Sequence, residues 1–161
     1  MPTPFLSKTL FAAVFTAAIS ATSIMAIAPA LADEITTYAP DGVAIHGTDP
    51  VAYFTMGKPV AGSDKFTATH DGVTWKFSTA ENRDAFVATP TKYAPAYGGY
   101  CATGTSFGQK VVTAPEHWKI VDGKLYLNSS PGAHTRFLDN TASTITNANA
   151  NWPKIKNVAS N

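Results

Sequence analysis

The sequence predicts an α+β fold, in which a small antiparallel sheet of hairpins carries helices packed on one face within a single domain. Two turn signals predict the hairpins, because Asp71-Gly72 and Asp122-Gly123 each separate two runs with apolar residues at alternate positions. Apolar residues at helical spacing follow each hairpin. Antiparallel strands covered by helices are typical of the α+β class.

Residues 1–32 have the pattern of a secretory signal peptide. One charge, Lys8, precedes a long alanine-rich apolar run that ends in the small-x-small cleavage pattern Ala30-Leu31-Ala32. A membrane anchor is the rival interpretation, because the apolar run is long enough to span a bilayer. The cleavage pattern favours removal, so we expect a periplasmic or secreted protein of residues 33–161, without a membrane segment after cleavage.

The composition limits the partners of this exported domain. The whole chain has 12 Lys and Arg against 11 Asp and Glu, and cleavage removes only Lys8. A balanced charge without basic runs argues against nucleic acid and against an anionic membrane surface. Cys101 is the sole cysteine, so no internal disulfide forms and packing must supply the stability.

The segments before the first hairpin are predicted to be mostly extended. Residues 35–46 read as an arm with a turn at Pro40-Asp41-Gly42. Residues 51–55 follow a proline and contain two aromatic residues, which favours a short strand. Residues 56–59 are predicted to form a loop.

Counting outward from Asp71-Gly72 predicts the register of the first hairpin, since directly opposed residues point to the same face. That face is apolar except for one histidine. The opposed pairs are His70 with Val73, Ala68 with Trp75, and Phe66 with Phe77.

A helix is predicted to follow this hairpin. Ser78 suits its N-cap position, and Glu81 stands three residues later, where it completes a capping box. Pro90 ends the helix, because the residue before a proline is disfavoured in the α conformation.

The second half of the chain is predicted to hold an irregular loop, a hairpin and two helices. Residues 93–108 are rich in glycine, proline and tyrosine and read as the loop. Residues 131–139 and 141–152 carry inward-facing apolar residues at helical spacing. The second hairpin pairs Val121 with Lys124, Ile120 with Leu125, and Trp118 with Leu127.

Several short motifs together resemble the YHS domain family, a small metal-associated module. The motifs are Asp49-Pro50-Val51, His70 before the turn, Trp75-Lys76-Phe77-Ser78, Phe86, Pro90 and Tyr93. Two further stretches, 97–102 and 122–128, are similar to a longer secreted branch of that family. The resemblance runs from about Ile45 to Trp152 and implies a core over 45–101 with a C-terminal extension over 102–161.

The resemblance also implies a metal site that this sequence has lost. Metal-binding members of the family carry cysteines where this chain has Ala52, Ser78 and Asn82. Thiolates are the ligands that hold soft or borderline metals, and alanine cannot coordinate at all. The family's thiol site is therefore dismantled here.

A replacement metal site is the leading functional hypothesis. Imidazole and thiolate both suit copper, and secondly zinc, so His46, His70 and Cys101 are the candidate ligands. The alternative for each histidine, and for His117 and His134, is a hydrogen-bonded or solvated side chain. For Cys101 the alternative is a small buried apolar residue.

Two other classes of function are weighed against metal handling. An enzyme would need Cys101 activated by a histidine, and no phosphate loop, dinucleotide motif or nucleophile elbow is present, so catalysis is not supported. A small-ligand or protein-binding domain is the main alternative, and exposed aromatic residues would mark its surface. The same aromatic residues would otherwise build the core. They are Tyr53, Tyr93, Tyr97, Tyr100, Trp118 and Tyr126.

Overall fold

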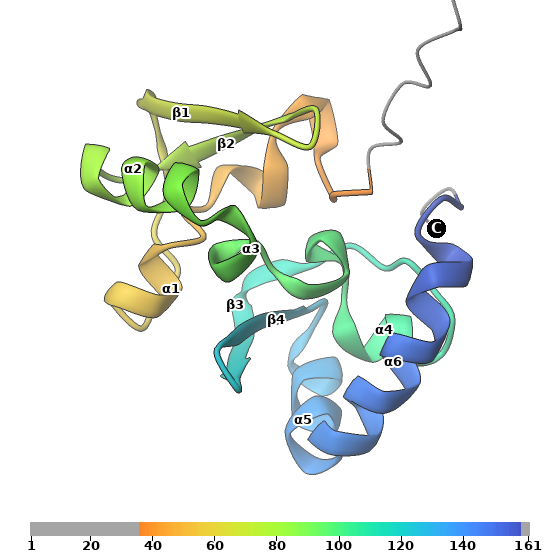
Figure 1. Cartoon of the computed structure of the whole chain (residues 1–161). Helices are drawn as coiled ribbons and strands as arrows, with labels where there is room; N and C mark the ends of the chain where they lie inside the picture. The colour runs from red at the N-terminus through yellow and green to blue at the C-terminus, as the bar shows by residue number, and fades with distance from the viewer. Residues whose placement is uncertain (1–35, 159–161) are drawn as a thin grey trace, which may run out of the picture. The chain divides into compact units, whose positions relative to one another are not determined.

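Two antiparallel hairpins form two separate two-stranded sheets (Figure 1). Strand β1 (Ser63–His70) pairs with β2 (Val73–Phe77), and β3 (Ala114–Val121) pairs with β4 (Lys124–Asn128). The computed structural model describes residues 36–158, so the predicted signal peptide lies outside the described residues. Asp71 and Asp122 have φ angles of 51° and 49°, and each is followed by a glycine with positive φ. These are the tight turns that the Asp-Gly pairs predict.

The predicted register is confirmed next to both turns. His70 lies opposite Val73 and Ala68 opposite Trp75, and all three predicted pairs of the second hairpin are present. The predicted pairing of Phe66 with Phe77 is wrong, because the register shifts between Ser63 and Thr67 and brings Ser63 opposite Phe77. An irregularity of this kind adds residues to one strand and bends it.

Helix α2 (Ala80–Ala88) packs its one buried residue, Phe86, onto the first hairpin. The Phe86 ring lies 4.9 Å from that of Trp75 and 5.2 Å from that of Phe77. The predicted cap at Ser78 is one residue early, since the Thr79 side chain accepts the Asn82 N–H at the start of the helix. The Ser78 side chain does not cap the helix and hydrogen-bonds to Asp49 instead.

Three segments that were predicted to be extended or irregular are partly helical. Residues 52–55 form the short helix α1 (Ala52–Thr55) instead of the predicted strand. The predicted loop contains the end of α3 (Pro90–Tyr93), then η3 (Ala96–Gly99) and α4 (Ala102–Ser106). The N-terminal arm folds into two 3-10 turns, η1 (Pro40–Gly42) and η2 (Ala44–Gly47).

The two C-terminal helices are confirmed as α5 (Pro131–Asp139) and α6 (Thr141–Ile155). The Ser130 side chain caps α5 by accepting the Ala133 N–H. Helix α6 continues past its predicted end through Pro153, and it runs beside α4 (Figure 1).

Buried side chains gather in two clusters, and the described residues form a single α+β domain, as predicted. The first cluster joins the N-terminal turns, both hairpins and α2. The second lies among η3, α4, β4, α5 and α6 and includes Tyr97, Tyr126 and Phe137. Within residues 36–158, no helix combines the length and the apolar character needed to cross a membrane.

Candidate functional site

His46 lies on the surface in the N-terminal turns. Its Nε2 donates to the carbonyl of Thr113 at 2.9 Å. The Tyr38 ring packs edge-on against the imidazole, with the ring centroids 5.0 Å apart. One ring nitrogen of His46 therefore already serves as a hydrogen-bond donor that ties the N-terminal segment to the chain before β3.

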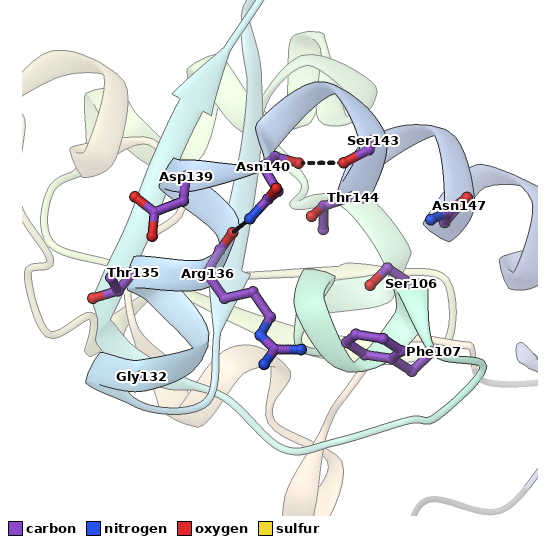
Figure 2. Close-up of a pocket in the computed structure, with 10 residues that line it drawn as sticks. All are labelled: Ser106, Phe107, Gly132, Thr135, Arg136, Asp139, Asn140, Ser143, Thr144 and Asn147. Carbon is purple, nitrogen blue, oxygen red and sulfur yellow. Dashed lines mark hydrogen bonds between the residues drawn. The ribbon is translucent and has the colours of Figure 1, made fainter.

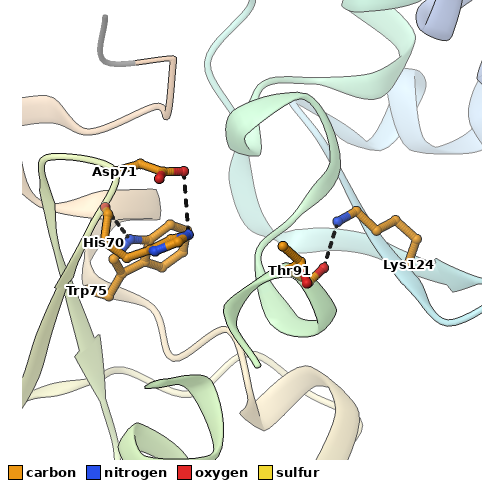
Figure 3. A network of polar contacts seen from close by, with 5 residues as sticks. All are labelled: His70, Asp71, Trp75, Thr91 and Lys124. Atoms are coloured by element: carbon orange, nitrogen blue, oxygen red, sulfur yellow. Dashed lines mark hydrogen bonds and ion pairs between the residues drawn. The ribbon is translucent and has the colours of Figure 1, made fainter. Parts of the chain in front are cut away.

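His70 lies next to the turn of the first hairpin, on the face that covers the core. Its Nε2 is 3.4 Å from Oδ2 of the neighbouring Asp71 (Figure 3). Its ring meets the Phe86 ring edge-on at 5.7 Å, and its carbonyl accepts the indole N–H of Trp75 at 3.2 Å. These contacts make His70 a packing residue at the junction of hairpin and helix.

Cys101 is buried beneath α4, in a different part of the domain. Its Sγ accepts the Gly104 N–H at 3.3 Å and so caps the first turn of α4. The thiol also lies 3.7 Å from Oδ1 of Asn128, a fully buried residue that accepts from Thr103 as well. The thiol thus acts as a small buried residue with a capping role, the structural alternative considered above.

These three side chains do not form the predicted metal centre. Among residues 36–158, no three His, Cys, Asp or Glu side chains are grouped so that they could hold a metal ion. His46 bonds to Thr113, His70 packs with Phe86, and Cys101 caps α4. The physical reason is that each side chain satisfies a different local contact.

The positions at which the resemblance expects cysteines do converge, on the carboxylate of Asp49. Asp49 is 0% exposed. Its Oδ1 accepts from the Val51 and Ala52 N–H groups at 2.9 and 3.2 Å. Its Oδ2 accepts from the Ser78 N–H at 2.8 Å, the Ser78 hydroxyl at 2.6 Å and the Asn82 amide at 2.7 Å. We call this arrangement the Asp49 joint, and it fastens α1, the end of β2 and α2 together.

Hydrogen bonding within the Asp49 joint explains two departures from the predicted elements. The carboxylate satisfies two N–H groups at the start of α1, which favours a helical turn where a strand was expected. The Ser78 hydroxyl donates to Asp49, and Thr79 takes over the capping of α2. The joint is closed and structural, because five donors occupy the buried carboxylate.

A polar pocket lies between α4, α5 and the start of α6. Its volume is about 530 Å³. We call it the Arg136 pocket (Figure 2). Its lining residues are Ser106, Phe107, Gly132, Thr135, Arg136, Asp139, Asn140, Ser143, Thr144 and Asn147.

The charged side chains of the Arg136 pocket form no ion pair among the described residues. The Arg136 guanidinium lies 5.5 Å from the centroid of the Phe107 ring, which is 63% exposed. The three ion pairs of the described residues involve other side chains, so neither Arg136 nor Asp139 has a charged partner there. Figure 2 shows the guanidinium of Arg136 beside Phe107 and the carboxylate of Asp139 directed away from it.

One hydroxyl in the wall of this pocket has no hydrogen-bond partner among residues 36–158. Thr144 is 5% exposed and lines the wall, and its hydroxyl makes no hydrogen bond within the part of the chain that the structure describes. Solvent reaches this hydroxyl, since the buried side-chain atoms without a partner in the described residues are Nδ2 of Asn128 and Nδ1 of His134. Water or a ligand in the pocket can therefore bond to it. The pocket therefore offers donors and acceptors that the protein itself leaves free.

A second hollow lies between β3 and α5, beside a pair of histidines. The rings of His117 and His134 are 6.1 Å apart. The Nδ1 atom of His134 is buried and has no hydrogen-bond partner among residues 36–158. Burial, followed by the nearby His117 and Lys119, lowers the pKa of His134 below its usual value, so this imidazole is held in its neutral form.

The aromatic residues mainly build the core instead of a surface. Tyr53, Tyr97, Tyr100 and Tyr126 are each at most 8% exposed. Tyr93 and Trp118 are half-buried and pack against the first cluster. The aromatic surface predicted for a binding domain is therefore wrong for most of its members, and the core alternative is confirmed.

Comparisons with protein-family models, with curated proteins and with solved structures found no match. The candidate site consequently rests on geometry. Sequence reasoning missed Arg136 and Phe107, because nothing local links two residues that meet only when α4 packs beside α5. An arginine and an aspartate one helical turn apart, at 136 and 139, are the single signal that was present.

Proposed function

We propose that this protein is an exported, YHS-like binding domain that has lost the family's thiolate metal site and binds a small polar ligand in the Arg136 pocket. Export follows from the signal-peptide pattern of residues 1–32. The YHS-like character follows from the motifs between Ile45 and Trp152. The protein binds its ligand without transforming it.

The Asp49 joint supports the loss of the metal site. The Ser78 hydroxyl and the Asn82 side-chain amide donate hydrogen bonds to the Asp49 carboxylate. Ala52 donates only its backbone N–H to it. A soft metal needs thiolate or imidazole lone pairs that are free to coordinate. Copper or zinc handling through His46, His70 and Cys101 loses its basis for the same reason, since these side chains are committed elsewhere.

The observation that carries the proposal is that Arg136 and Asp139, the two charged residues that line the Arg136 pocket, form no ion pair among the described residues. Ligand sites are concave and present a few polar groups that converge on the bound molecule. Here Arg136, Asp139 and the hydroxyl of Thr144 face one cavity without protein partners among the described residues. We assign these three groups to a ligand, because they line one cavity and form no ion pair or side-chain hydrogen bond among the described residues.

The test is a ligand screen on the exported protein, read by thermal unfolding. A ligand at a hundred times its dissociation constant stabilises the folded state by about 2.7 kcal/mol, which is a readily measured shift. Hits are then titrated into the wild type, Arg136→Gln and the matched control Arg83→Gln, whose arginine pairs with Asp84 on α2. We expect Arg136→Gln alone to weaken binding, by about tenfold.

The same preparation is assayed for copper, zinc and iron. The proposal expects well under one metal ion per chain and no stabilisation when copper is added. Stoichiometric metal in the purified protein, or hits that bind the two arginine variants equally well, would contradict it.

A further inference from the structure

We infer that the ligand of the Arg136 pocket is a small zwitterion, a molecule carrying one carboxylate and one ammonium group. This inference rests on the proposed function and specifies the chemistry of that same site. It assigns the carboxylate to Arg136 and the start of α6, and the ammonium to Asp139.

The balance of charge in the pocket selects this class. Arg136 and Asp139 are its only charged lining residues, one of each sign, and they are not paired with each other or with any other described residue. A simple anion would be attracted by Arg136 and repelled by Asp139. A simple cation would be attracted by Asp139 and repelled by Arg136. Only a ligand with both charges satisfies both groups.

The carboxylate end is placed by the first turn of α6. This 15-residue helix has no side-chain cap, because the Asn140 amide donates to the carbonyl of Arg136 instead of serving the α6 backbone. Free N–H groups at a helix start favour an anionic oxygen group. Asn140, Ser143 and Thr144 of this turn line the same pocket as Arg136.

Thr144 gives an independent indication of a ligand at this end. Thr144 is 5% exposed and lines the pocket, and its solvent-accessible hydroxyl has no acceptor or donor among residues 36–158. A carboxylate oxygen held between the guanidinium and the helix start would accept from this hydroxyl. Arg136 is also positioned by the Phe107 ring, which holds the guanidinium over one face of the pocket.

The two charges of the ligand are expected to be separated along a short chain. Arg136 and Asp139 both line the pocket but point away from each other (Figure 2), and no nitrogen of the one lies within 4.0 Å of an oxygen of the other. A ligand must therefore span the gap between them. A cavity of about 530 Å³ leaves room for a chain of several methylene groups.

The experiment titrates a series of ω-amino acids into the exported protein by calorimetry. The probes are glycine, 4-aminobutyrate and 6-aminohexanoate, with butyrate, hexanoate, butylamine, hexylamine and inorganic phosphate as single-charge controls. We expect one chain length to bind best, and to bind about tenfold more tightly than the acid or the amine of equal length. Equal binding of an acid and its amino acid would overturn the assignment.

Two variants separate the ends of the ligand. Arg136→Gln is expected to weaken the best zwitterion and the acids about tenfold and to leave the amines unchanged. Asp139→Asn is expected to weaken the zwitterion and the amines and to leave the acids unchanged. Both side chains are exposed, so the variants should fold, which thermal unfolding checks. Loss of all binding in both variants alike would contradict the two-ended assignment.

The outcome also distinguishes this inference from the proposed function. If a neutral compound from the screen binds in an Arg136-dependent manner and no zwitterion binds, the pocket is a ligand site and the inference is wrong. If no compound binds in an Arg136-dependent manner, both are wrong.

Discussion

The hydroxyl of Ser78 donates to the carboxylate of Asp49 at 2.6 Å, across 29 positions of the chain. Asn82 reaches the same oxygen from α2 at 2.7 Å, and the start of α1 uses the other oxygen. One buried carboxylate therefore fixes three elements of the first half of the domain. In the proposed account, the Asp49 joint occupies the position of the family's metal site and holds the three elements together in place of the metal.

Removing the carboxylate is expected to destabilise the whole domain. Asp49→Asn presents an amide N–H₂ to donors that need an acceptor, and buried unsatisfied donors are costly. We expect the free energy of unfolding to fall by about 3 kcal/mol or more. Urea denaturation measures this, with the exposed Asp41→Asn as control. A loss below about 1 kcal/mol, within the range of ordinary substitutions, would contradict the structural role of the joint.

Restoring the thiols is expected to restore metal binding. Ser78 and Asn82 already contact one oxygen of Asp49, and the Ala52 N–H contacts the other. The triple variant Ala52→Cys, Ser78→Cys, Asn82→Cys should therefore bring three sulfurs together, and thiolates bind zinc strongly. We expect about one zinc ion per chain under reducing conditions. A folded triple variant that binds no more zinc than the wild type would show that these positions are not a former metal site.

Lys110 is expected to fasten the C-terminal end of α6. Its ammonium donates to the carbonyls of Lys156 and Val158 at 2.9 and 2.8 Å and lies 4.6 Å from the centroid of the Tyr100 ring. A cation at a helix C-terminus is stabilising, and more so when partly buried. We expect Lys110→Met to cost about 1–2 kcal/mol and to speed amide hydrogen exchange over 150–158. Lys154→Met, on the exposed side of the same helix, should change neither.

Stability is expected to fall in mild acid because of His134. Its pKa is lowered in the folded state, by burial first and then by His117 and Lys119, so the unfolded chain binds the proton more readily. The contribution is intact above the ordinary histidine pKa of about 6.5 and is lost as the pH falls below it. Unfolding measured between pH 8 and pH 5 should show this loss, and His134→Gln should reduce it. An unchanged pH profile in the variant would assign the acid sensitivity to other groups.

Local signals in the sequence predicted both hairpins and the two C-terminal helices. The Asp-Gly turns set the registers of both hairpins near the turn, and the helix predicted over 131–139 is α5. The helix at 52–55 was missed because two aromatic residues suggested a strand. Asp49 before Pro50 is itself a helix-start signal, and its carboxylate does accept the first N–H groups of that turn.

The candidate site was beyond local reasoning. His46, His70 and Cys101 have suitable ligand chemistry, but each is held by a neighbour that no sequence pattern reveals, such as the Thr113 carbonyl for His46. Phe107 and Arg136 come together only through the packing of α4 beside α5. A charged side chain without an ion-pair partner can be recognised only when the positions of all its possible partners in the fold are known.

The most direct test of the account is to map where a ligand binds, by following backbone amide NMR signals of the exported protein. During titration with the tightest compound of the screen, we predict that the shifted signals are those of Phe107, Arg136 and residues 139–144, which surround the Arg136 pocket. Shifts centred instead on His46, His70 or Cys101, induced by copper or zinc at one ion per chain, would contradict the account. They would indicate that the protein binds a metal ion at those side chains.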